Sequence, residues 1–171
     1  MSTETIFNLQ LVLGYAAWLL CFRAYIMPRL KDMDMAAAQR AIATFHSFRF
    51  VGLAFIVPGV VGPTLPAAFA NFAAYWDLAT GVLAMLALLT ARIRSLFWLF
   101  VVAFNVVGTV DLVLDYYHAT RIGLPALAGQ LGAMYVVPII YVPLLMITHL
   151  TAFYLLLRSW RVRVLAGEVV A

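Results

Sequence analysis

Five long apolar stretches constrain the fold more strongly than any other feature of this sequence. Each comes close to the ~20 residues that an α-helix needs to cross the hydrocarbon core of a bilayer. Short polar or Pro/Gly-rich segments separate them, and we expect spans at approximately 6–26, 41–61, 68–90, 96–117 and 131–157. The pattern predicts an all-α integral membrane protein, with residues 1–171 forming a single transmembrane domain built as a bundle of five helices.

Composition and charge agree with this class. Hydrophobic residues make up 66% of the 171 residues and charged residues only 11%, whereas roughly a quarter of the residues in soluble domains are charged. The net charge of +4 does not predict nucleic-acid binding, because the basic residues are scattered between apolar stretches. Cys21 is the only cysteine, which excludes an intramolecular disulfide and a cysteine-based metal cluster.

The positions of the basic residues predict an orientation. Ten of the eleven lie around the first loop, the third loop and the carboxyl end, and only Arg121 belongs to the other side. By the positive-inside rule the amino terminus is outside and the carboxyl terminus is cytoplasmic. The chain shows no targeting segment, so we expect a multi-pass protein of the bacterial inner (cytoplasmic) membrane.

The fourth apolar stretch carries a polar face. On a helical period Gly108, Asp111 and Asp115 fall within one quadrant, and Asn105 extends that face. A carboxylate in hydrocarbon costs several kcal/mol, so this face should turn toward protein, water or a ligand. In the third stretch, Asp77 lies within a stripe of small residues, at a depth similar to that of Asp111.

Two carboxylates at one depth indicate acid–base chemistry. If the third and fourth helices pack together, repulsion between Asp77 and Asp111 in apolar surroundings favours one protonated and one ionised group. The protonated acid can then donate a proton and the carboxylate can accept one. We therefore predict four catalytic residues: Asp77, Asp111, Asn105 and His149.

A second polar group is expected deeper, toward the cytoplasmic half. His46 and Arg49 are three residues apart and share one helical face, and the fifth stretch presents a stripe that includes His149. Whether this group and the aspartates share one cavity is left open. The predicted ligand-binding residues are Tyr135, Tyr141, His46, Arg49, Asp115 and Trp76.

These residues also have structural interpretations. Asp77 and Asp111 can tie helices together by accepting hydrogen bonds. Arg49 can extend toward lipid headgroups beside an interfacial His46. His149 can bond a backbone carbonyl that a nearby proline leaves free.

Three functions are compatible with the sequence. The first is a cofactor-independent acid–base enzyme of the isomerase, cyclase, hydratase or lyase type. The second is an electron-carrying bundle in which His46 and His149 ligate haem. The third is a proton-coupled transporter, which with five helices would need to form a homo-oligomer. The expected partners are the lipid bilayer and an apolar or amphiphilic small molecule, without nucleic acid. No metal site is expected, because the histidines lie at different depths.

Overall fold

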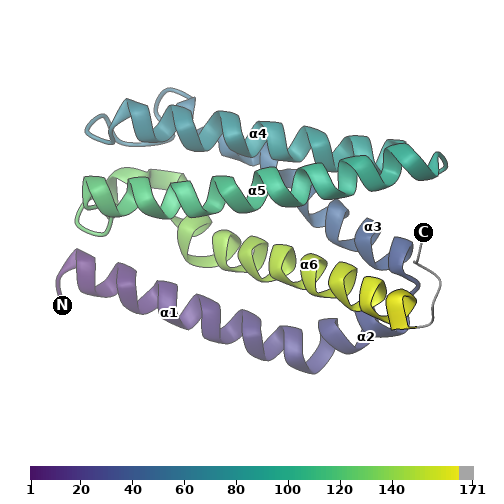
Figure 1. Ribbon diagram of the computed structural model, residues 1–171. Helices are drawn as coiled ribbons and strands as arrows, with labels where there is room; N and C mark the ends of the chain where they lie inside the picture. The colour runs from purple at the N-terminus through teal and green to yellow at the C-terminus, as the bar shows by residue number, and fades with distance from the viewer. Residues whose placement is uncertain (166–171) are drawn as a thin grey trace.

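The computed structural model describes residues 1–165, and it describes side chains as far as Arg158. In this part of the chain every regular element is a helix and there are no strands. The long helices run alongside one another as a bundle (Figure 1). The all-α class expected from the apolar stretches is confirmed.

The first rod of the bundle is continuous from residue 3 to residue 32. It consists of α1 (Thr3–Cys21), the π-helical turn η1 (Phe22–Ile26) and α2 (Met27–Asp32). Ser2 caps it by accepting a 3.2 Å hydrogen bond from the Thr5 N–H. The widened π turn comes directly before Pro28, which has no N–H to continue the normal hydrogen-bond ladder. Only 17% of the residues in the most apolar part of this rod are buried, so most of its side chains face outward.

The second segment begins as an α-helix and then changes its winding. Asp34 caps α3 (Met35–His46) by accepting a 2.9 Å hydrogen bond from the Ala37 N–H. After His46 the chain tightens into the 3₁₀ helix η2 (Ser47–Ile56), which packs along α4. The expected span at 41–61 is therefore not an uninterrupted α-helix, and it ends at Ile56 because Pro58 and Gly59 form a turn.

Two long helices form one side of the bundle. These are α4 (Ala67–Leu89), which follows Pro66, and α5 (Arg94–Ile122), and they pack side by side (Figure 1). Helix α5 extends beyond the predicted 96–117 at both ends. It stops where Gly123 adopts a left-handed conformation with φ of 65°, a common helix terminator.

The last apolar stretch contains three different helical segments. They are the 3₁₀ segment η3 (Ala128–Tyr135), the π-helical turn η4 (Val137–Tyr141) and α6 (Val142–Leu165). The expected span at 131–157 thus begins within η3, and the candidate span by length and composition runs from Val137 to Arg158. Pro138 and Pro143, which lack N–H donors, lie where the winding changes.

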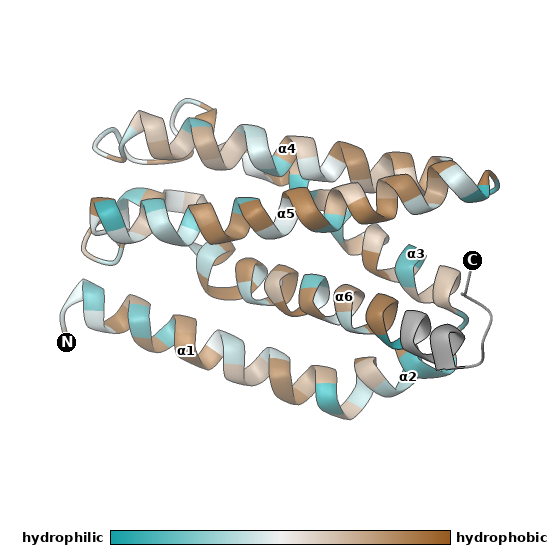
Figure 2. Ribbon diagram, viewed as in Figure 1, coloured by the Kyte–Doolittle hydropathy of each residue, from teal (hydrophilic) through white to brown (hydrophobic). Residues whose placement is uncertain are grey.

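Four helices of the described chain are long and apolar enough to cross a membrane. They are Thr3–Asp32, Ala67–Leu89, Arg94–Ile122 and Val137–Arg158. Hydrophobic residues cover most of their length (Figure 2). These helices indicate a membrane-embedded protein. The expected second span is not among the four, because its α-helical part has only 12 residues.

The core consists of two apolar clusters with a polar layer between them. Along α4, one cluster contains Phe69 and Ala74, whereas the other contains Ala84 and Ala87. Asp77 is buried between these two groups on the same helix. The polar layer thus lies in the middle of the bundle, far from the helix ends.

Candidate functional site

Arg49 occupies the centre of the polar layer. It lies near the start of η2, and its side chain is completely buried. Its Nε donates a 2.6 Å hydrogen bond to Oδ1 of Asp77 on α4, and its Nη2 pairs with Oδ2 of Asp111 on α5. A buried guanidinium requires compensating carboxylates. Arg49 therefore ties η2, α4 and α5 together, and we refer to Arg49, Asp77 and Asp111 as the ion-pair cluster.

This arrangement corrects the interfacial interpretation of Arg49 and His46. Both residues have 0% exposed surface, so neither reaches lipid headgroups. The 3₁₀ winding after His46 places Arg49 against α4, where Asp77 provides a stronger partner than solvent. The inner and outer polar groups expected from the sequence are thus one contiguous network.

The aspartates do not meet as a simple acid–base pair. Asp77 and Asp111 each bind a different nitrogen of the guanidinium, so one cation is shared between two anions. Oδ1 of Asp111 has no hydrogen-bond partner among the described residues. The cluster carries one more negative charge than positive when both carboxylates are ionised.

Two glycines allow the helices to approach this closely. A Cβ atom at Gly52, on η2, would collide with the carboxylate of Asp77. A Cβ atom at Gly108, on α5, would collide with the His149 ring and with the Thr80 side chain. The missing side chains therefore create the space in which the ion-pair cluster and His149 fit.

His149 supports the guanidinium from α6. Its Nδ1 lies 2.9 Å from Oδ1 of Asn105, whose Nδ2 donates to the Val101 carbonyl at 2.8 Å. The Asn105 oxygen is therefore an acceptor, which assigns the proton to Nδ1 of the ring. Nε2 of His149 is then free to accept from Nη1 of Arg49 at 3.4 Å. A second long contact, at 3.5 Å, joins Nη1 to the Gly108 carbonyl.

His46 lies directly against His149. The two ring centroids are 3.9 Å apart and the ring planes are inclined by 37°. Nε2 of His46 is 2.9 Å from the oxygen of the Thr148 hydroxyl, and the hydroxyl proton is shared between two backbone carbonyls of α6 at 2.9 Å. Nδ1 of His46 is buried without a described partner. The two histidines therefore form a stacked pair beside the ion-pair cluster.

This stacking does not fit the haem alternative. Two axial ligands of one haem lie on opposite faces of the porphyrin, with the whole macrocycle between them. The rings of His46 and His149 touch each other instead, and both Nε2 atoms have protein partners.

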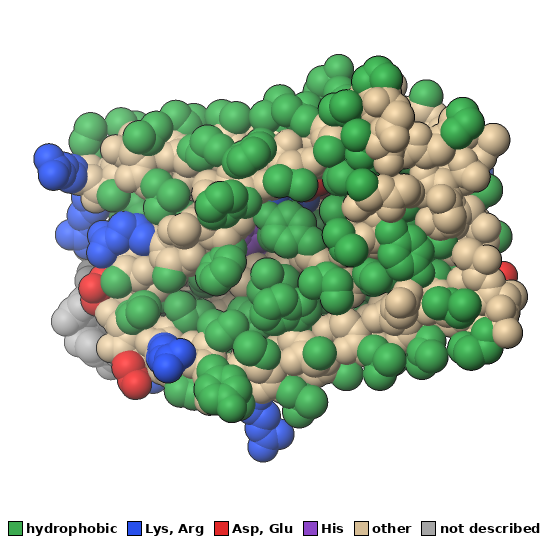
Figure 3. Space-filling view, turned by 180° about the vertical axis from the view of Figure 1, so that it is seen from behind, with side chains coloured by type: hydrophobic (Ala, Val, Ile, Leu, Met, Phe, Trp, Pro, Cys, Tyr) green, Lys and Arg blue, Asp and Glu red, His purple; other side chains and the backbone are tan. Residues whose placement is uncertain are grey.

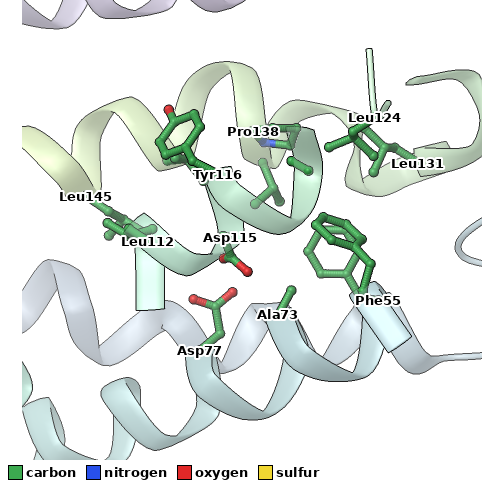
Figure 4. Close-up of a pocket in the computed structure, with 14 residues that line it drawn as sticks. Phe55, Ala73, Asp77, Leu112, Asp115, Tyr116, Leu124, Leu131, Pro138 and Leu145 are labelled. Atoms are coloured by element: carbon green, nitrogen blue, oxygen red, sulfur yellow. The ribbon is translucent and has the colours of Figure 1, made fainter. Parts of the chain in front are cut away.

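A small cavity of about 50 Å³ adjoins the ion-pair cluster. Asp77 and Asp115 point toward one another across it from α4 and α5, and the ring of Phe55 closes one side (Figure 4). Most of the remaining lining is apolar and comes from α4, α5, η3 and the start of the last span. Oδ1 of Asp115 is buried and has no described partner. Asp115 therefore differs from Asp77, which is held by a cation.

Three predicted ligand-binding residues lie outside the cavity and the cluster. The Tyr135 hydroxyl donates a 2.6 Å hydrogen bond to Oε1 of Gln10, and the Tyr141 hydroxyl donates to the Phe45 carbonyl at 3.2 Å. Trp76 is 36% exposed and packs against Phe72. The two tyrosines therefore link neighbouring helical segments, and the tryptophan packs on the surface of α4.

The structure also identifies residues that the sequence analysis did not select. Gly52 follows Arg49 by three residues, and Thr80 follows Asp77 by three, so each shares a helical face with the charged residue. Tyr116 lines the cavity, while its hydroxyl bonds that of Tyr15 at 2.7 Å. The three-residue spacing is the signal that would have pointed to Gly52 and Thr80.

Fold and site together define a class: a small all-helical bundle with candidate membrane-spanning helices and one buried arginine between two aspartates. The chain belongs to the family described as Domain of unknown function (DUF8737), whose model matches residues 6–157. The match includes every residue of the ion-pair cluster and the cavity. No curated protein and no solved structure matches the chain.

Proposed function

We propose that this protein is a membrane enzyme that performs acid–base chemistry on an apolar or amphiphilic small molecule. The observation that carries the proposal is that Asp77 and Asp115 face one another across a largely apolar cavity (Figure 4). At about 50 Å³ this cavity has room only for the few reacting atoms of a substrate, so the rest of the molecule would lie outside it. Arg49 favours the ionised form of Asp77, which makes that carboxylate the base. Asp115 has no cation partner among the described residues, which makes its protonated form the acid.

The proposed reaction moves a proton and a double bond within one substrate. Asp77 removes a proton from a carbon next to a double bond, and Asp115 adds a proton at the far end of that bond. The same two groups would serve a cyclase, hydratase or lyase, because each reaction pairs a proton donor with a proton acceptor. Apolar walls keep water from competing for the proton.

The other polar residues act as positioning groups in this proposal. Arg49 fixes the carboxylate of Asp77, and Asp111 balances the remaining charge of the guanidinium. His149 and Asn105 orient the guanidinium from the opposite side. These residues determine which face of Asp77 is presented to the cavity.

The proposal includes five spans and a bacterial inner-membrane location. Segments α3 and η2 contain 12 and 10 residues, and their rises of 1.5 and 2.0 Å per residue give a rod of about 38 Å, enough to cross a bilayer. Lys and Arg side chains gather at one end of the molecule (Figure 3). That end would be cytoplasmic by the positive-inside rule, with the amino terminus outside.

Hydrogen exchange into a lipid substrate tests the enzyme proposal. The purified protein is incubated in heavy water with a bacterial lipid extract, and mass spectrometry follows new isomers and deuterium incorporation. We expect both in the wild type and neither in Asp77→Asn, because a carbon-bound proton passes through that carboxylate. Glu4→Gln, which removes an exposed acid at the start of α1, is the matched control. Equal results for wild type and Asp77→Asn would overturn the proposal.

A proton-coupled transporter is the second candidate, and one observation favours it. Arg49 binds Asp77 and Asp111 at the same time. Protonation of either carboxylate would therefore leave the guanidinium ion-paired with the other carboxylate. Such a cluster would alternate between two arrangements, as a relay requires. Proton flux into proteoliposomes, lost in Asp111→Asn, would support transport, whereas no flux above that of empty liposomes would exclude it.

A further inference from the structure

A second hollow lies at the opposite end of α6 from the cavity, between the first rod and α6. It is an open groove of about 710 Å³, within the range of about 300–1,000 Å³ of small-molecule sites. The apolar part of its lining includes Leu19, Phe22, Ile147 and Leu150. Leu19 and Leu150 are more than half exposed, so the groove is open along its length.

Two cations line this groove, and both follow Leu19 along the first rod. Arg23, on the π turn η1, and Lys31, on α2, both line it and are exposed. Among the described residues neither forms an ion pair. Lys31 Nζ instead lies 5.7 Å from the centre of the Tyr154 ring, which places the ammonium over the groove.

The spacing of these features matches one class of ligand. The apolar wall lies beside Leu19 and Leu150 within the span, and the cations follow toward the helix end where basic residues are concentrated. A phospholipid has the same order, because its acyl chains lie in the hydrocarbon region and its phosphate lies at the interface. Two cations without an acidic partner favour an anionic headgroup over a zwitterionic one.

We propose that this groove binds one anionic glycerophospholipid, with its phosphate between Arg23 and Lys31 and an acyl chain between Leu19 and Leu150. The lipid fills the space that separates the first rod from α6. Pro28 and Met27 complete the wall near the phosphate. The binding surface is independent of the ion-pair cluster and of the proposed enzyme activity.

Native mass spectrometry of the full chain in mild detergent tests this inference. The protein is titrated with phosphatidylglycerol and, separately, with phosphatidylcholine that has the same acyl chains. We expect one phosphatidylglycerol to remain bound when other lipids dissociate, and Arg23→Gln with Lys31→Gln to weaken its binding about 30-fold. Arg92→Gln with Arg94→Gln makes the same charge change in the α4–α5 turn and at the first residue of α5, and it should bind like the wild type.

Two further arms distinguish a lipid site from other anion sites. Leu150→Trp fills the apolar groove and leaves both cations intact, so it should also release the lipid. Inorganic phosphate should not displace the lipid, because a free anion gains nothing from the apolar wall. Equal binding of the two lipids, equal loss in both charge variants, retention by Leu150→Trp or displacement by phosphate would each overturn the inference.

Discussion

At the scale of single residues, the guanidinium of Arg49 determines the electrostatics at the centre of the bundle. Its Nε and Nη2 bind Asp77 and Asp111, while Nη1 makes longer contacts with His149 and the Gly108 carbonyl. In a low-dielectric interior each of these groups is stable because the others are present. Removing one of them leaves the charges of the remaining groups buried without a compensating partner.

Replacing Arg49 by Met should destabilise the protein by about 3–5 kcal/mol, because two buried carboxylates lose their cation. The free energy of unfolding is measured by denaturant titration in mild detergent. The triple variant with Asp77→Asn and Asp111→Asn should recover most of the loss, since no uncompensated charge is then left. Arg92→Met, at an exposed position in the α4–α5 turn, is the control. A stable Arg49→Met single variant would contradict the ion-pair cluster.

Asp111→Asn should lower the stability of the protein, whereas Asp115→Asn should lower its activity and leave its stability unchanged. Asp111→Asn weakens a charge-assisted hydrogen bond to Arg49 and should cost about 1.5–3 kcal/mol of stability. Asp115→Asn removes no described partner, so its stability should stay within about 0.5 kcal/mol of wild type. In the heavy-water assay, however, Asp115→Asn should lower turnover about 100-fold or more. Unchanged turnover would remove Asp115 from the proposed acid role.

The candidate residues were accessible to sequence reasoning, but their partners were not. Asp77, Asp111 and His149 stand out because ionisable groups are costly inside an apolar stretch. The pairing with Arg49 does not follow from helical periodicity, because η2 winds as a 3₁₀ helix after His46. Three residues per turn instead of 3.6 rotates the later side chains relative to the expected face.

At the scale of elements, close approach at glycines sets the geometry. Gly52 brings η2 to within contact of Asp77 on α4, and Gly108 brings α5 to within contact of His149 on α6. These close contacts fix the positions of the helices more strongly than the local preference for α, 3₁₀ or π winding does. The reason is that the buried polar groups of the central layer must form hydrogen bonds with one another. The helices therefore meet where their side chains are smallest.

Gly108→Ala should destabilise the protein by about 1–3 kcal/mol, because the new methyl group collides with the His149 ring and with Thr80. It should also lower turnover in the heavy-water assay, since His149 contacts Arg49. Gly129→Ala is the matched control, because no atom lies within 4 Å of a Cβ at that position. Equal stability of the two variants would mean that α5 and α6 do not pack as closely as described.

At the scale of the whole molecule, the number of spans decides on which side each loop lies. Four helices qualify by length and composition, and the α3–η2 rod is the proposed fifth. With five spans, the turn at Thr64 is outside, and the loops at Met33 and Ser95 are cytoplasmic. If α3–η2 does not cross, Thr64 and Ser95 exchange sides.

Single cysteines distinguish these topologies. Cys21 is replaced by Ser, and Cys is introduced separately at the exposed positions Met33, Thr64 and Ser95. We expect a membrane-impermeant maleimide to label only Thr64→Cys in intact cells, and all three variants once the membrane is permeabilised. Labelling of Ser95→Cys without Thr64→Cys would instead establish four spans.

The sequence by itself determined the helical class and the presence of buried ionisable groups, because these depend on local composition and spacing. Tertiary structure decided where the helices change their winding and which groups meet. Asp77 and Asp111 share one guanidinium, the histidines stack, and Asp115 faces Asp77 across the cavity. Those contacts join residues 28 to 103 positions apart. The ionic ones arise because a buried charge binds the nearest compensating group that packing brings within reach.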